Sequence, residues 1–524
     1  MRLRHLLLFG LTTGLFAPLP AQLPLLTAPR GTMRIEFGGS FHPTTTVWRD
    51  GAKQDLGEVL TLPALTASST PLLADLEARL GQLLGRPATA TRLGGLTTTA
   101  ELQRGVGTIG LALGITRRIT IFGTVPIVSV RSQHAIGYNP DGSTVGANPA
   151  DPTLGSAAGR VQTAAFFDSF DAALATLAQR YTRGDYTSDP TKQALAQQTL
   201  TNAPLLRNSL YALLSDSATA SAVLPTGSSA DGSALLGQIG AVRNTLTNDL
   251  GISSFTGAPA LPTVPLDSAG FTALLSSPTG FDLAAPEDRP LVGIGDIEGG
   301  VTAELLQRGH PGEASWLGLW VQGLGRFRTG QLPRANYLFD QGTGDRQLDA
   351  EVAAIVELGR HRLGLRAEGR YTMQLASDRF ARVAPRDQLL VPTTRRAAVH
   401  SNPGDILQVT AQPFFRLAPR LAFTGLVSYW RRGADVSSYV AGQTAVGPSG
   451  VNAEVLDPGS AADALLVGVG FSYSHDGVHR DGIRRMPVEA GFSIERTVRS
   501  GRGLVPASLT SRLVFRVYKA LIKH

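Results

Sequence analysis

Cysteine is absent from this chain of 524 residues. Without thiols the protein can form no disulfide, no thiolate metal site and no cysteine nucleophile, and it cannot carry a lipoprotein anchor. Beyond the N-terminus the sequence also lacks any uninterrupted apolar run long enough for a helical membrane span. If the chain enters a membrane, it must therefore do so as a closed β-barrel, because lipid leaves an unpaired strand edge unsatisfied.

Aromatic and charged residues are also scarce, at 6% and 17% of the chain. In contrast, 59 glycines and 32 prolines indicate many strands joined by turns rather than a helical enzyme. The net charge is +7, and arginine is spread through alternating segments instead of being clustered beside aromatic residues. This distribution predicts no binding of nucleic acid.

Residues 1–21 have the layout of a secretory signal peptide. Arg2 and Arg4 precede an apolar core over 6–16, and a plausible cleavage site lies in 18–21. Export of a chain without cysteine is typical of a bacterial periplasmic or outer-membrane protein.

The stretch 351–375 alternates between an oily and a charged face. In its second half apolar residues follow one parity, from Leu363 to Met373, and polar residues follow the other, from Arg362 to Arg370. A side-chain period of two indicates strands, and the short break between the two halves indicates a tight hairpin. A charged face argues against a sandwich core, so the pattern predicts the apolar exterior and polar interior of a membrane barrel.

Similar segments recur along the chain and predict an all-β transmembrane barrel of about 12 antiparallel strands. Short and long connections alternate between them, as in bacterial outer-membrane barrels, which places both termini on the periplasmic side. The strands are expected at 33–41, 97–115, 118–130, 291–307, 315–329, 351–358, 362–375, 406–417, 420–432, 464–474, 486–498 and 509–521.

A large helical insertion is expected between strands 3 and 4. Leucine and other apolar residues recur at helical spacing over 164–183, 190–216 and 233–250, with Gly, Ser and Pro between them. We expect this region to form an extracellular cap or a lumen plug with its own internal core. The predicted organisation is a signal peptide (1–21), barrel strands 1–3 with a partly helical loop at 43–96 (22–131), the insertion (132–290) and barrel strands 4–12 (291–524).

Two short motifs resemble a known group of outer-membrane barrels. GIGDIEGG over 293–300 is similar to a Gly-x-Gly-Asp motif of the meta-pathway phenol-degradation transporters, a group that resembles the FadL-like long-chain fatty-acid transporter superfamily. The segment 114–131, GITRRITIFGTVPIVSVR, is similar to that group's tight-turn strand with a proline, here Pro126. The insertion has no counterpart in this resemblance. Only residues 22–32 precede the first strand, too few for the N-terminal plug of a fatty-acid transporter.

The resemblance implies passive transport of small, hydrophobic solutes across the outer membrane. The expected partners are outer-membrane lipid, a small-molecule solute and the barrel-assembly machinery during biogenesis. The alternative hypothesis is a surface protein that uses the barrel only as an anchor for an extracellular binding insertion. No cofactor is expected.

Charged side chains on the polar face are candidates for the lumen wall. They can form either a structural network that braces the barrel or a polar pore that selects solutes, since isolated charges in a narrow lumen are costly. Glycines at the start of strand 4 are candidates for a strand kink and lateral opening, together with one aspartate: Gly293, Gly295, Asp296, Gly299 and Gly300. The lumen candidates are Arg34, Glu36, Glu298, Glu304, Glu351, Glu357, Arg362, Arg366, Glu368, Arg370, Arg416, Glu489, Glu495, Arg512 and Arg516.

Catalytic and metal sites are not expected. His475, Asp476, His479 and Asp481 could chelate a metal, but a solvated Asp-Gly turn explains them more simply. No serine and histidine pair on the lipid face matches the needs of an outer-membrane phospholipase, and among the histidines only His361 adjoins a strand core. The sequence therefore predicts a protein that is not an enzyme.

Overall fold

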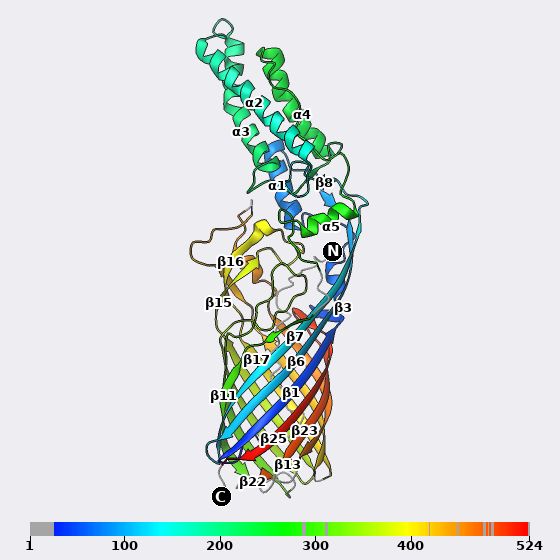
Figure 1. The fold of residues 1–524 in the computed structure, drawn as a ribbon, viewed down its shortest axis with the longest axis vertical. Coiled ribbons are helices and arrows are strands. Elements are labelled where there is room, and N and C mark those ends of the chain that lie inside the picture. Colours follow the sequence, from blue (N-terminus) through cyan, green and yellow to red (C-terminus); the bar gives the residue numbers. More distant parts are fainter. Residues whose placement is uncertain are drawn as a thin grey trace.

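A computed structural model shows a closed antiparallel β-barrel with a helical cap at one end (Figure 1). It describes residues 26–285, 290–309, 313–418, 420–447, 450–474, 478–479, 482–483 and 487–521. The expected signal peptide and most of the turn with His475, Asp476, His479 and Asp481 lie outside these residues.

The barrel is one sheet in which every strand pairs with its neighbour in an antiparallel sense. Pairing between β6 and β7 closes the ring. Strands β10 and β11 both pair with β7 and together form one interrupted strand, so the barrel has twelve strands, as predicted. They are β1 (Thr32–Thr44), β6 (Gly95–Gly114), β7 (Ile119–Asn139), β10 (Leu291–Ile294), β11 (Glu298–Arg308), β12 (Trp316–Arg326), β13 (Asp349–Arg360), β14 (Leu363–Gln374), β17 (Ile406–Ala418), β18 (Leu421–Arg432), β20 (Ala462–Ser474), β23 (Val488–Arg499) and β25 (Leu509–Ala520).

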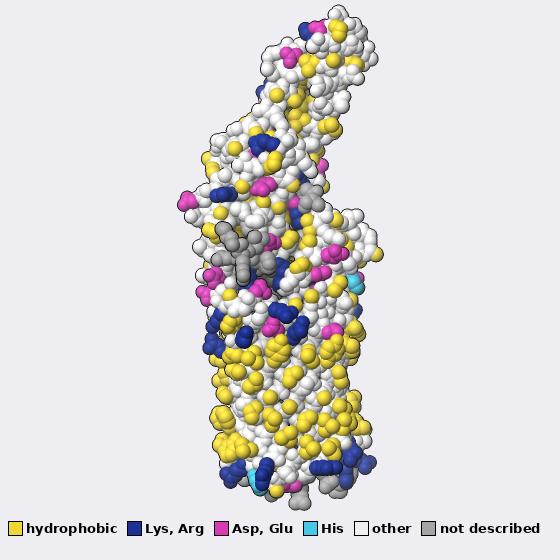
Figure 2. Space-filling model, turned by 180° about the vertical axis from the view of Figure 1, so that it is seen from behind, with side chains coloured by type: hydrophobic (Ala, Val, Ile, Leu, Met, Phe, Trp, Pro, Cys, Tyr) yellow, Lys and Arg dark blue, Asp and Glu magenta, His cyan; other side chains and the backbone are white. Residues whose placement is uncertain are grey.

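Side chains along the barrel strands point alternately outward and inward, and the outward ones are apolar. Leu513 on β25 is 59% exposed, whereas its neighbours Arg512 and Val514 are buried inside. Figure 2 shows such side chains forming a broad apolar belt across the visible face of the barrel, with charged residues at both edges. A belt of this kind is the exterior of a barrel that spans a membrane. None of the described helices is long and apolar enough to span one.

The described start and end of the chain meet at the barrel end opposite the cap. The backbone N–H of Leu521 donates to Gly31 O over 2.8 Å. Just before β1, Ala28 is fully buried, and its N–H donates to the hydroxyl of Thr120 at the start of β7 over 2.7 Å. The segment 26–29 thus lies against the inner wall, although the sequence suggested too few residues for any plug.

The hairpin of β6 and β7 is the longest in the barrel and rises beyond it toward the cap (Figure 1). Its cross-strand pairs run from Gly114 and Thr120 to Gly95 and Asn139. The sequence places the end of this strand at 130, because the expected insertion opens with the turn-rich stretch GYNPDGSTVGANPADP over 137–152. Pairing along the hairpin overrides that local preference.

Five helices make up the cap, and capping residues begin each of them. Ser156 and Asp189, for example, accept backbone hydrogen bonds at the N-termini of α2 and α3. Left-handed Gly85 and Gly184 end α1 and α2. The helices are α1 (Pro71–Leu84), α2 (Ala157–Arg183), α3 (Pro190–Leu214), α4 (Ala230–Asn244) and α5 (Ser268–Ser276), of which α5 was not foreseen.

The cap has its own apolar core, built from both long loops of the N-terminal half of the chain. Phe170 and Phe255 stack with their ring centroids 4.3 Å apart, and both are buried. Leu73 and Leu76 of α1 join the same cluster. Small outer sheets lie between cap and barrel, including β15 (Ser377–Arg382), β16 (Arg396–Asn402) and β19 (Val436–Tyr439). The helices therefore stand beyond the barrel rather than inside it (Figure 1).

Candidate functional site

The inner wall of the barrel carries nearly all of the charged residues singled out from the sequence. Arg366, Arg370, Glu351 and Glu357 are buried at inward positions of β13 and β14. Glu298, Glu304, Glu368, Arg34, Glu36, Glu489, Glu495, Arg512, Arg516 and Arg416 also occupy inward positions, Arg416 near the end of its strand. Arg362 was predicted wrongly, because it lies in the exposed turn between β13 and β14 and not on the wall.

Buried ion pairs join neighbouring strands on one side of the lumen. Arg366 donates to Glu357 over 2.7 Å, and both side chains are almost completely buried. Four residues further along β14, Arg370 pairs with Glu351 at 2.6 Å and also with Glu368. Such pairs help to fix the positions of their strands, because a buried charge that loses its partner is costly.

A second group of ion pairs lies on the side where the chain begins and ends. Arg516 of β25 pairs with Glu36 of β1 at 2.5 Å and with Glu489 of β23 at 3.7 Å. The hydroxyl of Tyr518 donates to Glu489 over 2.9 Å. Arg512 pairs with Glu495 at 2.5 Å. These contacts tie the last two strands to the first one.

Arg326 of β12 links its two neighbouring strands, β11 and β13, and was missed from the sequence. It donates to Glu298 over 3.1 Å and to Asp349 over 2.7 Å, at the end of β12. Its position at a strand end gave no clear alternation, so neither Arg326 nor Asp349 stood out.

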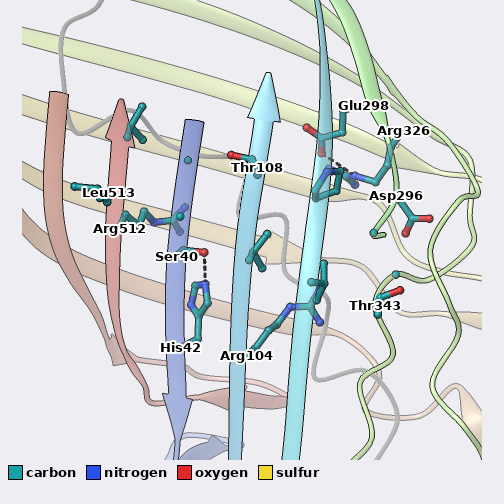
Figure 3. Close-up of a pocket in the computed structure, with 18 of the residues that line it drawn as sticks. Ser40, His42, Arg104, Thr108, Asp296, Glu298, Arg326, Thr343, Arg512 and Leu513 are labelled. Carbon is teal, nitrogen blue, oxygen red and sulfur yellow. Dashed lines mark hydrogen bonds and ion pairs between the residues drawn. The ribbon is translucent and has the colours of Figure 1, made fainter. Parts of the chain in front are cut away.

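Two cavities lie along the lumen and share Glu298 in their walls. The lower one encloses about 900 Å³ of empty space, open solvent included, between the ion pairs and Leu26. The upper one encloses about 860 Å³ on the same measure. Its side chains come from β25, β1 and β6 and from the region of Asp296 and Thr343 (Figure 3). His42 belongs to this upper wall, hydrogen-bonded to Thr510 and Ser40, because β1 continues beyond the end predicted at Phe41.

The strand next to the upper cavity is interrupted at the predicted glycine motif. Ile294 pairs with Ile127, and Glu298 pairs with Thr124, so three residues of this strand face two of β7. The extra residue makes a bulge, and Pro126 opposite it has no N–H to continue the ladder. Gly293 lies on β10, Gly295 and Asp296 lie in the interruption, and Gly299 and Gly300 lie on β11.

The upper half of this strand, β10, is hydrogen-bonded to β7 but to no second strand among the described residues. The reason is that β12 ends at Arg326, and the chain then turns inward as a loop, 327–348, before β13. The outward side chains of Val292 and Ile294 on β10 are more than half exposed. The barrel wall therefore has a notch beside β10.

The loop 327–348 closes this notch from the inside. The hydroxyl of Thr343 donates to Ile294 O over 2.8 Å, and the hydroxyl of Thr329 donates to Gly295 O over 2.7 Å. The same Thr329 oxygen accepts the N–H of Ile297 over 2.8 Å. The loop thus satisfies backbone groups that a neighbouring strand would otherwise pair.

Asp296 connects the interruption to the loop 327–348. Its buried carboxylate accepts the N–H of Gly330 over 2.8 Å and that of Asp345 over 2.9 Å. A Cβ on Gly344 would lie 2.1 Å from a carboxylate oxygen, so the fit requires glycine there. Burial, and next the neighbouring Asp296 carboxylate, raise the pKa of Asp345 above the usual aspartate value.

No family model matches the chain, and no curated protein matches it. Among solved structures, an outer membrane channel from Pseudomonas putida F1 is similar at 8% identity and TM-score 0.40, over 94% of this chain and 97% of that one. The P. putida toluene transporter TodX is 11% identical at TM-score 0.24, over 95% and 92%. The translocator domain of the autotransporter NalP from Neisseria meningitidis is 8% identical at TM-score 0.27, over 93% and 88%. These identities and TM-scores are too low to carry an argument. The barrel architecture is therefore established by the strand pairing of this chain.

Among the described residues, no group of three or more His, Asp or Glu side chains is arranged to hold a metal ion. The loop 327–348 is the part of the site that sequence reasoning missed. The sequence indicates this segment only as one of the longer connections between strands and not where that connection lies.

Proposed function

We propose that this protein is an outer-membrane channel for the passive transport of small hydrophobic solutes, with the interruption at 295–297 as a lateral exit. A solute enters the upper cavity from the cap side and leaves between β10 and β12 into the membrane. The observation that carries the proposal is the notch beside β10, which lies between the upper cavity and the apolar belt and is closed from the inside by the loop 327–348. The motif resemblance at 293–300 favours the same function.

The charges of the lumen favour a lateral exit over passage along the barrel axis. An axial path would lead an apolar solute past the buried ion pairs of Arg366 and Arg370 on one side and of Arg516 on the other. These groups hold each other in place and offer no apolar surface. A path through the notch is short and reaches Val292 and Ile294, which face the membrane. In this proposal the charged side chains of the lumen wall form a structural network that braces the barrel, which is the first of the two hypotheses from the sequence.

The connections support the membrane orientation that we propose. The long loops and the cap lie at one end, and the short turns lie with the described termini at the other. In bacterial outer membranes short turns face the periplasm. We therefore place both termini in the periplasm and the cap outside the cell, after insertion by the barrel-assembly machinery.

A reversible cross-link across the notch tests the lateral exit. A Cβ on Gly293 would lie 3.2 Å from the Thr343 methyl group, so Gly293→Cys with Thr343→Cys brings two thiols within reach of a disulfide. The chain has no other cysteine. In proteoliposomes, the oxidised double variant is expected to take up a fluorescent apolar probe at least about tenfold more slowly than the reduced one, because the loop cannot leave the notch.

The matched control is Ser377→Cys with Ser401→Cys, a cross-strand pair of β15 and β16 outside the barrel. Its oxidation should leave uptake unchanged. Equal uptake by the oxidised and reduced forms of the Gly293 and Thr343 variant would exclude the lateral exit.

Uptake is also expected to depend on pH through Asp345. Because its pKa is raised in the closed state, closure is favoured by the bound proton and weakens as pH rises from the ordinary aspartate pKa of about 3.9 through the raised value. Asp296 faces Asp345 from the interruption and Arg326 faces it from β12. Uptake should increase across this window, and Asp345→Asn, which mimics the protonated form, should abolish the increase. A wild-type profile that falls over the window would contradict this prediction.

A further inference from the structure

A third cavity lies on the side of the cap, between the loop 327–348 and the segment 383–391 that follows β15. It encloses about 760 Å³ of empty space, open solvent included. Leu338 and Phe339 line it from the loop, and Leu389 and Leu390 line it from the segment 383–391. The two cavities of the lumen share none of its described lining residues. We call it the junction cavity.

Gln388 gives the junction cavity a polar group without a partner. Its side-chain Nε2 donates to Ala67 O over 3.4 Å, which leaves Oε1 as the other end of the amide. That oxygen is buried and has no hydrogen-bond partner among the described residues. Buried acceptors are normally hydrogen-bonded, so a ligand that donates to this oxygen would satisfy it.

The charged side chains around the junction cavity are already engaged. The guanidinium of Arg334 lies over the ring of Tyr337, 3.6 Å from its centroid, and pairs with Asp340 over 2.9 Å. Arg382 is buried and donates to Ala335 O over 2.8 Å. A charged ligand would have to compete with these contacts, whereas an uncharged one leaves them intact. The lining therefore favours an uncharged ligand with an apolar body and one hydrogen-bond donor.

The loop 327–348 forms one wall of the junction cavity and also closes the notch. Asp340 accepts the N–H of Arg334 over 2.9 Å and that of Gly342 over 3.2 Å. The hydroxyl of Thr343, which donates to β10, accepts the N–H of Gln331 over 2.9 Å. These contacts join the cavity wall at 333–340 to the residues that lie against β10. A displacement of the loop from the notch therefore displaces the wall as well.

The opposite wall, 383–391, is held by the cap. The N–H of Leu389 donates to Ser69 O over 2.7 Å, and the hydroxyl of Thr70 donates to Leu390 O over 2.7 Å. Ser69 and Thr70 directly precede α1. When the loop leaves the notch, its wall moves away from this anchored one. A ligand between the two walls then loses the contacts of one of them.

We propose that the junction cavity is a regulatory site for a compact, uncharged apolar molecule that carries a hydroxyl group. The hydroxyl donates to Gln388 Oε1, and the apolar body packs against both walls. Because both walls are in place only when the loop closes the notch, the ligand favours the closed state and slows uptake. The proposal rests on the proposed function, since the closed state is that of the lateral exit.

Isothermal titration calorimetry of the full chain in detergent tests the binding. The probe is 1-adamantanol, and its matched analogue is 1-methoxyadamantane, which has no donor. The wild type is expected to bind the alcohol about fivefold more tightly than the ether. Gln388→Leu removes the acceptor and should abolish this preference. Gln443→Leu, in an exposed outer loop, is the control variant and should keep it.

The labelling of a single cysteine measures the effect on the loop. Thr343 is 1% exposed, so a maleimide reagent reaches the thiol of Thr343→Cys only when the loop moves. The chain has no cysteine of its own. At ten times its dissociation constant, 1-adamantanol should slow the labelling about tenfold, because a ligand bound only by the closed state lowers the open population by that factor. With Gln388→Leu added, the same concentration should slow it only about threefold.

Equal affinity of the wild type for the two probes would overturn the proposal, and this comparison needs no variant. So would a preference retained in Gln388→Leu, with both glutamine variants shown to be folded by far-ultraviolet circular dichroism, or binding that leaves the labelling rate unchanged. The proposed function fails separately. If oxidation of the Gly293 and Thr343 cysteine pair left uptake unchanged while the alcohol still slowed the labelling, the junction cavity would be supported and only the lateral exit excluded.

Discussion

Replacing Asp296 by alanine is expected to open the notch and increase the uptake of a hydrophobic probe by about 30-fold. In the closed state this carboxylate accepts the N–H groups of Gly330 and Asp345, both in the loop 327–348. Its removal leaves two buried donors without a partner, at a cost to the closed state of about 2 kcal/mol in all. Each 1.36 kcal/mol changes a population about tenfold, so the open state gains about 30-fold.

Proteoliposome uptake measures this effect, with the rate compared at equal protein content. Asp405→Ala is the matched control, because Asp405 also accepts a backbone N–H, that of Gln374, and a hydroxyl, that of Tyr371, but lies away from the notch. That control should change uptake less than about twofold. If both variants behave alike, Asp296 does not hold the exit closed.

Breaking one ion pair of the lumen wall is expected to destabilise the barrel by about 3–5 kcal/mol. In Glu357→Leu the guanidinium of Arg366 remains, 3% exposed, with its carboxylate removed. Urea unfolding in lipid vesicles, followed by the fluorescence of Trp316 and Trp320 on the adjacent strand, should show a lower midpoint.

The double variant Glu357→Leu with Arg366→Met separates pairing from shape. With both charges removed, most of the stability should return, because no uncompensated charge remains. The exposed pair of Arg183 and Asp185 in the cap, with side chains 67% and 39% exposed, is the control, and breaking it should cost about 0–1 kcal/mol. A double variant as unstable as Glu357→Leu would show that the volume of the side chains, not their charge, matters at this position.

Alternation made most of the barrel predictable. Leu363 and Arg366 are close in sequence but must face opposite sides of a sheet, so their polarity alone indicates which side is oily. The same reasoning located twelve strands and the inward position of Glu36 and Arg516. It failed at Arg362, because a turn interrupts the period and alternation no longer determines direction.

Contacts between distant segments were beyond the reach of such patterns. The glycine motif indicated that strand 4 bends, but nothing near Thr329 or Thr343 indicates that their hydroxyls replace a missing neighbour strand. Likewise, the pairing of Arg395 with Asp75, 2.6 Å apart, joins residues 320 positions apart in the chain. The alternation of side chains along a strand indicates which face is buried. The contact partner of a residue in a distant segment depends instead on the fold of the whole chain.

The extra residue between Ile294 and Glu298 also reverses which side of the wall the even-numbered positions face. On β10, Val292 and Ile294 point to the membrane, whereas on β11, Glu298 and Thr302 point into the lumen. An uninterrupted strand could not satisfy both halves. It would send either the valine and isoleucine into the charged interior or the glutamate into lipid. The number of residues in the interruption 295–297, more than their flexibility, therefore allows both β10 and β11 to lie in the barrel wall with their apolar side chains outward.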